Sequence, residues 1–298
     1  FLAMVAGLVI GLVILSQSIA IERVYDTLTG NLPTPTPLPS ELATRATQLM
    51  LVGDYDAAAL LLEKAVEERP DNVAYLYEYG NLLIDIGRAD EAYPIGEHIT
   101  DLNARDVRGF ALQARSLVWQ GQPSTAIPIA LAAMEVDPRF TALYEALARA
   151  YVDTSRWNEG LDMAERGLAI DPNDASLSRV YAYALQSVAE YDLAIQQLEQ
   201  SIELRPAFLP TYFELAGLYL SRDRDQEAID LYDRILSIEP RNARAMLRQC
   251  LAYRKVGEFS RALGFCEDSV SNDPTDPEAL FQLGLLYYRE RRFNDSKE

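Results

Sequence analysis

The sequence predicts an all-α protein, a right-handed α-solenoid of stacked helix pairs preceded by one transmembrane helix. Small and large apolar residues recur every 34 positions, prolines recur at the end of the same unit, and residues 1–21 carry no charged side chain. Of the 298 residues, 49% are hydrophobic and 24% are charged, a balance typical of a folded chain rather than a disordered one.

Residues 1–21 are long enough for a membrane-spanning helix, because about 20 helical residues cross the ~30 Å hydrocarbon core. We expect a retained anchor. The alternative is a signal peptide cleaved after Ala20, since Ser18 and Ala20 are small residues at a suitable spacing. Small residues also stand four positions apart on one face, where another membrane helix could pack: Ala3, Gly7 and Gly11.

Residues 22–38 are expected to form a linker rich in Pro and Thr. Its prolines occupy alternate positions up to Pro39, a pattern that excludes a helix and favours an extended spacer. The flank next to the apolar segment, with Glu22, Arg23 and Asp26, lacks the excess of cations found on the cytoplasmic side of membranes. The expected localisation is therefore a single-pass membrane protein with its repeats outside the cytoplasm, on the periplasmic side.

Residues 39–298 carry a repeat of 34 residues without insertions. One column is small in every unit: Ala58, Ala92, Ala126, Gly160, Ala194, Ala228, Ala262 and Ser296. So is a second column: Ala46, Gly80, Ala114, Ala148, Ala182, Ala216, Cys250 and Gly284. Prolines close most units: Pro70, Pro138, Pro172, Pro206, Pro240 and Pro274. The expected units are 39–72, 73–106, 107–140, 141–174, 175–208, 209–242, 243–276 and an incomplete 277–298.

A 34-residue helix–turn–helix unit of this kind resembles the tetratricopeptide repeat family, here in a bacterial membrane-anchored form. The clearest copy is GDYDAAALLLEKAVEERP, from Gly53 to Pro70. The resemblance implies about fifteen antiparallel helices and a concave groove, lined by the first helix of each unit, that takes an extended peptide or a partner's helix. Pro94 and Gly96 depart from the pattern in the second unit, where we expect either local repacking or a softer joint.

The groove positions implied by the resemblance carry several arginines. The predicted partner-binding residues are Arg115, Arg149, Arg179, Tyr183, Arg244 and Arg248. Carboxylates occupy the same kinds of position: Glu78, Asp85, Glu145, Asp153, Glu214 and Glu278. Because guanidinium groups pair well with carboxylates, an acidic peptide or helix is one expected ligand. The alternative is that solvated arginines merely line an open face.

Composition argues against most enzymatic functions. A net charge of −18 disfavours nucleic acid, which requires clustered cations. One histidine, His98, two cysteines and no Gly-rich phosphate loop leave no expected catalytic residue, metal, cofactor or small-molecule substrate. Cys250 and Cys266 either form a disulfide between the two helices of one unit or remain two buried thiols.

The expected function is a membrane-tethered, non-enzymatic scaffold for protein–protein interaction, an accessory or assembly subunit of a larger membrane complex whose membrane helices it contacts. One alternative is the regulatory repeat region of an enzyme or transferase whose catalytic domain lies beyond residue 298. Another is a periplasmic adaptor released by signal cleavage.

Overall fold

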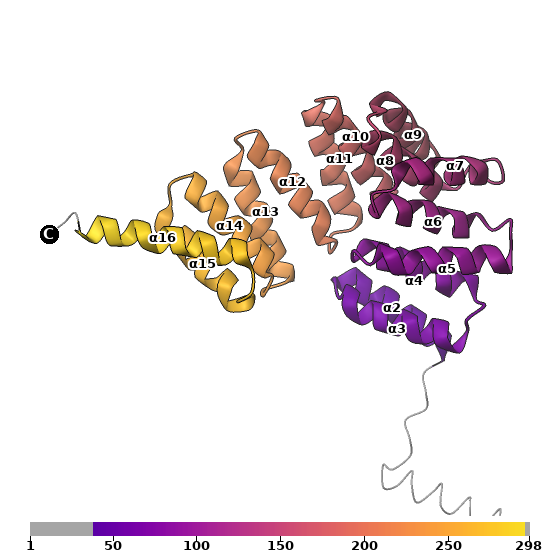
Figure 1. Cartoon of the computed structure of the whole chain (residues 1–298), viewed down its shortest axis with the longest axis horizontal. Coiled ribbons are helices and arrows are strands. Elements are labelled where there is room, and N and C mark those ends of the chain that lie inside the picture. Colours follow the sequence, from indigo (N-terminus) through magenta and orange to yellow (C-terminus); the bar gives the residue numbers. More distant parts are fainter. Residues whose placement is uncertain (1–37, 296–298) are drawn as a thin grey trace, which may run out of the picture. The chain divides into compact units, whose positions relative to one another are not determined.

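The computed structural model describes residues 38–295 (Figure 1). The chain divides into two units, residues 1–38 and 39–298, and all the described helices belong to the second. The predicted anchor, its face of Ala3, Gly7 and Gly11, and nearly all of the linker lie outside the described residues.

The expectation of a single-pass membrane protein is corrected by the structure. Between residues 38 and 295, no helix is both long enough and apolar enough to cross a bilayer. The described helices have 12–19 residues, and most of them interleave apolar with charged side chains, as helices with one buried face do. The membrane localisation, and with it the preceding transmembrane helix of the predicted fold, is therefore not supported.

Fifteen helices and no strand make up the described residues, which confirms the predicted all-α solenoid. The first helices of the units are α2 Pro39–Val52, α4 Val73–Asp85, α6 Val107–Trp119, α8 Thr141–Asp153, α10 Ala175–Ser187, α12 Leu209–Ser221, α14 Ala243–Lys255 and α16 Pro277–Asp295. The second helices are α3 Tyr55–Glu68, α5 Ala89–Leu102, α7 Pro123–Met134, α9 Trp157–Ile170, α11 Tyr191–Leu204, α13 Asp225–Ile238 and α15 Phe259–Asn272. Every first helix begins 34 residues after the previous one, so the sequence period is also the structural period.

The two small columns hold the helices of each pair together. Their side chains are fully buried at Ala58, Ala92, Ala126, Ala194, Ala228 and Ala262, and at Ala46, Ala114, Ala148, Ala182, Ala216 and Cys250. Small side chains let two helix backbones approach closely, while larger residues such as Leu62, Leu82 and Leu147 fill the space between neighbouring pairs. Cys250 on α14 and Cys266 on α15 form a disulfide with their Cα atoms 5.3 Å apart.

The turn inside each unit has one residue in the left-handed region. Glycine takes this position in four units, at Gly53, Gly87, Gly121 and Gly257. Ser155, Ala189 and Asp223 take it in the other three, with φ between 57° and 65°. This residue ends the first helix, and the following N–H bonds back to a carbonyl five residues earlier, as from Arg88 to Leu83 at 2.7 Å. The tight turn keeps the two helices antiparallel.

Successive helices pack on neighbours one or two places along the chain, as Figure 1 shows for the series from α2 to α16. The array also curls enough to bring its first unit onto the turn between α11 and α12. There the rings of Tyr55 and Phe208 meet edge to face, with centroids 5.8 Å apart. The cavity described next lies on the concave side of this curvature and is partly open to solvent.

Candidate functional site

A cavity of about 890 Å³ lies inside the curl of the array. Its wall comes mainly from the turn between α2 and α3, the C-terminal ends of α4 and α6, the middle of α8, and the N-terminal halves of α10, α12 and α14. Five of the six predicted partner-binding residues line it: Arg115, Arg149, Arg179, Tyr183 and Arg244. The sixth, Arg248, does not, and its Nη1 lies 3.7 Å from Oε1 of Glu278.

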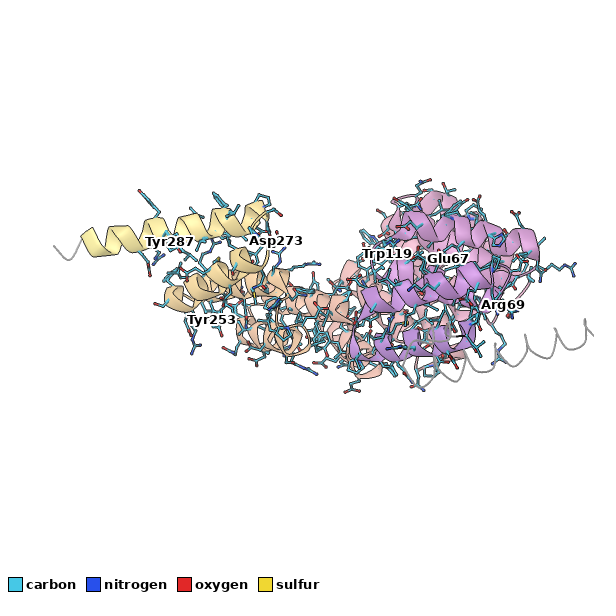
Figure 2. The ribbon with its side chains drawn as sticks, turned by 90° about the horizontal axis from the view of Figure 1, so that it is seen from below. Glu67, Arg69, Trp119, Tyr253, Asp273 and Tyr287 are labelled. Carbon is cyan, nitrogen blue, oxygen red and sulfur yellow. A yellow bond between two sulfur atoms is a disulfide. The ribbon has the colours of Figure 1, made fainter. Side chains whose placement is uncertain are left out.

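Trp119 is the most prominent apolar side chain of the wall. It ends α6, is 45% exposed, and is labelled in Figure 2. The guanidinium carbons of Arg149 and Arg179 lie 5.1 and 5.6 Å from its ring centroid. A cation over an indole face is held by the ring quadrupole. The two arginines therefore fix the orientation of the indole and leave about half of it open to an occupant.

Arg149 is held on three sides. Its guanidinium lies 3.9 Å from the ring centroid of Tyr183. Its Nε lies 3.1 Å from Oδ2 of Asp153. The hydroxyl of Tyr183 donates to Oδ1 of the same Asp153 at 2.8 Å. Burial raises the pKa of Tyr183, and its bond to Asp153 adds to the rise, so the phenol stays a donor at neutral pH. These contacts link Arg149, Tyr183 and Asp153 into one group.

Arg179 forms a bidentate ion pair with Glu214, which lies one repeat unit further along the chain. This pair neutralises its charge. Nε of Arg179 donates to Oε2 at 2.8 Å and Nη2 donates to Oε1 at 2.6 Å. The guanidinium also lies 5.3 Å from the ring centroid of Phe208. Parallel bonds of this type are the strongest that arginine makes with a carboxylate. A partner's carboxylate would have to compete with Glu214.

Arg115 is a buried charge rather than a free groove residue. It is 6% exposed, and its Nε and Nη2 lie 3.1 Å from Glu145 and 3.8 Å from Asp85. Its Nη1 also donates to the side chain of Asn81. Burial raises the pKa of the Glu145 carboxyl, and Arg115 opposes that rise. We therefore assign Arg115 to holding the wall together.

Arg244 differs from the other three arginines of the wall. It is exposed, and its guanidinium stacks 4.4 Å from the ring centroid of Phe213. The lining holds four arginines against six carboxylates: Asp54, Asp56, Asp85, Glu145, Glu214 and Glu239. Its formal charge is −2 when all are ionised, so the wall as a whole is not cationic. Aromatic faces and hydrogen-bond donors, rather than an excess of positive charge, are the features that it presents.

Of the aromatic residues in the wall, sequence reasoning predicted only Tyr183 and missed Tyr55, Trp119, Phe208 and Phe213. A signal for Trp119 was present, because it stands in the same repeat column as Asp85 and Asp153, both recognised as groove positions. His98 is not part of the lining. Among residues 38–295, no group of three or more His, Cys, Asp or Glu side chains could hold a metal ion.

Comparison with known proteins supports the repeat assignment. Two family models described as tetratricopeptide repeat match residues 49–116 and 181–243. The TPR repeat-containing protein YpiA of Bacillus subtilis is 22% identical over 208 residues, which cover 69% of this chain and 45% of YpiA. DnaJ homolog subfamily C member 3 of Gallus gallus is 23% identical over 287 residues, which cover 85% of this chain and 56% of that protein. The chain thus spans about half the length of these two relatives.

A solved structure agrees at the level of the fold. The crystal structure of TTC0263, a thermophilic TPR protein of Thermus thermophilus, superimposes with a TM-score of 0.52 at 21% identity. The superposition covers 61% of this chain and 99% of the TTC0263 chain. That likeness concerns the fold alone. The two family matches and the relatives that share the repeat show that the chain belongs to the tetratricopeptide repeat family, whose fold is in general a scaffold for protein–protein interaction.

Proposed function

We propose that this chain is a non-enzymatic scaffold that holds a segment of a partner protein in its cavity, as an accessory or assembly subunit of a larger protein complex. The single observation that carries the proposal is Trp119, a half-exposed indole fixed by two arginines inside a cavity of about 890 Å³. Buried aromatic and arginine side chains dominate the energy of protein interfaces, and an indole that is already oriented loses little entropy on binding.

Arg149, Tyr183, Arg179 and Arg244 are the proposed polar contacts around this anchor. Three of them are held by neighbouring side chains in the free protein, which makes the wall a preformed surface. Arg244 supplies a donor without such a carboxylate clamp, stacked on Phe213. We therefore expect the partner segment to place an apolar or aromatic side chain on Trp119 and an acceptor near Arg244. The proposed set omits Arg248, which lies outside the lining.

The test compares two tryptophans of similar exposure. Trp119 is 45% exposed inside the cavity, and Trp157 is 48% exposed at the start of α9, outside the lining. Tagged parent, Trp119→Ala and Trp157→Ala are used to capture proteins from the native extract. The protein that the parent retains should be lost with Trp119→Ala, by about 30-fold for a hot spot worth ~2 kcal/mol, and kept with Trp157→Ala. Equal retention by all three proteins would place the interface elsewhere.

A further inference from the structure

The first two units meet the turn between α11 and α12, far along the chain. Nη2 of Arg205 donates to Oδ2 of Asp85 at 2.8 Å across 120 residues of sequence. The rings of Tyr55 and Phe208 meet at 5.8 Å. Apart from this contact, the main helix packing joins helices no more than two places apart. Gly53 of the first unit also lies beside Ala207 and Ile238, whose atoms would be 3.4–3.5 Å from a Cβ built on it. The array is therefore closed on itself at a contact made of polar, aromatic and small apolar groups.

This contact borders the cavity from both sides. Tyr55 and Asp85 belong to the lining on the side of the first two units, and Phe208 belongs to it on the other. Separating them would widen the cavity without disturbing the stacked cores between successive units. We propose that Tyr55, Asp85, Arg205 and Phe208 form a clasp that opens and closes the array, and that a partner segment reaches the cavity when the clasp is open.

Both halves of the clasp keep a partner when it opens. Asp85 retains Arg115, whose Nη2 lies 3.8 Å from its Oδ1. Arg205 retains the ring of Phe208, 4.2 Å from its guanidinium and on its own side of the contact. Breaking an ion pair is costly when it strands an unpaired buried charge, and neither half is stranded here. Since the Arg205 side chain is 27% exposed, water and salt reach the pair and weaken it.

The first test disrupts the clasp by replacing Arg205, the more exposed member of its ion pair. Arg205→Gln takes away the cation but leaves Asp85 with Arg115. Arg69→Gln is the matched control, because Arg69 follows α3 as Arg205 follows α11, four units of 34 residues earlier, and is exposed (Figure 2). Small-angle X-ray scattering should show a larger radius of gyration for Arg205→Gln than for the parent and for Arg69→Gln. Raising salt from about 0.05 to about 0.5 M should expand the parent but not Arg205→Gln.

Access to the cavity is measured with a chemical probe. In a background of Cys250→Ala and Cys266→Ala, Ser176→Cys places one thiol in the wall. A bulky polyethylene-glycol maleimide should label it about tenfold faster after Arg205→Gln, equivalent to about 1.4 kcal/mol in the opening equilibrium. The small reagent N-ethylmaleimide should label both proteins at similar rates. Unchanged scattering together with unchanged bulky labelling would overturn the clasp.

A reversible lock provides the converse test. A Cβ built on Gly53 would lie 3.5 Å from the Cβ of Ala207, within the ~3.5–4.5 Å range of disulfides. In the same cysteine-free background, oxidised Gly53→Cys/Ala207→Cys should lose the salt-dependent expansion, and reduction should restore it. Backbone strain at Gly53 is present in both redox states and cancels in the comparison. Expansion by salt despite the closed bond would contradict the proposal. Since no partner is used, failure here leaves the Trp119 test of the proposed function unaffected.

Discussion

Gly96 on α5 and Gly109 on α6 lie in direct backbone contact between the second and third units. A Cβ on Gly109 would come within 2.7 Å of the Gly96 carbonyl oxygen, and one on Gly96 within 2.8 Å of the Gly109 oxygen. Helix α5 runs from Ala89 to Leu102 with Pro94 inside it. Of the two expectations for this departure from the repeat pattern, local repacking is the one that this close contact supports.

Gly109→Ala should destabilise the array. The added methyl overpacks a backbone contact, which costs about 1–3 kcal/mol and exceeds the ~1 kcal/mol that alanine gains in a helix. Gly217→Ala is the control, because Gly217 lies inside α12 with no atom within 4 Å of a built Cβ. It should stabilise by about 0.5–1 kcal/mol. Urea unfolding measures the free energy of unfolding of both variants. A change of that free energy in the same direction for the two variants would contradict the close contact between Gly96 and Gly109.

The disulfide between Cys250 and Cys266 should contribute measurably to stability. It joins α14 to α15 across 16 residues of sequence, and a loop of that size gains about 3 kcal/mol by restricting the unfolded chain. A reductant should therefore lower the unfolding midpoint of the parent. Cys250→Ala/Cys266→Ala should have the unfolding midpoint of the reduced parent, and the reductant should not change that midpoint. If the reductant exposes two thiols without changing the midpoint, the disulfide contributes no stability.

The fold was largely predictable because the residues that specify each helix pair lie within one 34-residue unit. A fixed period, two small columns and the closing prolines specify a helix pair, and the start of every first helix, from Pro39 to Pro277, keeps the same 34-residue interval. The membrane localisation was wrong, since it rested on residues 1–21 and no described helix supports it. The state of Cys250 was left open, because a thiol and a half-cystine fit a small column equally well.

The cavity was predictable only in part. The repeat columns place Arg149, Arg179 and Arg244 on one face, but they do not show which carboxylate each side chain meets. The pair of Asp85 and Arg205 depends on the curvature of the array, which sums small rotations over several units and is not encoded in any one of them. The 34-residue period alone therefore could not predict the contact between the first two units and the turn between α11 and α12.

The ion pair between Arg179 and Glu214 should show a measurable coupling energy. Arg179→Ala alone leaves Glu214 without its main partner, and Glu214→Ala does the same to Arg179. The double-mutant cycle should give a coupling of about 1 kcal/mol, limited by the partial exposure of Glu214. The exchanged pair Arg179→Glu/Glu214→Arg should recover most of the stability. Additive single effects in the cycle would mean that the two side chains act independently.

Two tyrosines should ionise unusually late, and they report on packing between neighbouring helices. Burial raises the pKa of Tyr219 to about 12, and its hydrogen bond to Glu199 at 2.9 Å adds to the rise. Burial likewise raises the pKa of Tyr181 to about 12, helped by its bond to Glu165 at 2.9 Å. Other tyrosines with raised pKa values, such as Tyr77 and Tyr232, also ionise late. In an alkaline titration followed by phenolate absorbance, the amplitude near pH 12 should therefore fall by one tyrosine in either Tyr219→Phe or Tyr181→Phe relative to the parent.

The sign of the accompanying stability change follows from linkage. Because the folded pKa of Tyr219 lies above its ordinary value of 10.0, the protonated phenol stabilises the fold fully below pH 10. That contribution is lost as the pH rises toward 12. Tyr219→Phe should therefore be less stable than the parent at neutral pH, by about 1 kcal/mol for one hydrogen bond, and the gap should narrow between pH 10 and 12. Urea midpoints at a series of pH values measure the gap. A gap that stays constant through that window would show that Tyr219 titrates as it does in the unfolded chain, and that its contact with Glu199 does not persist in solution.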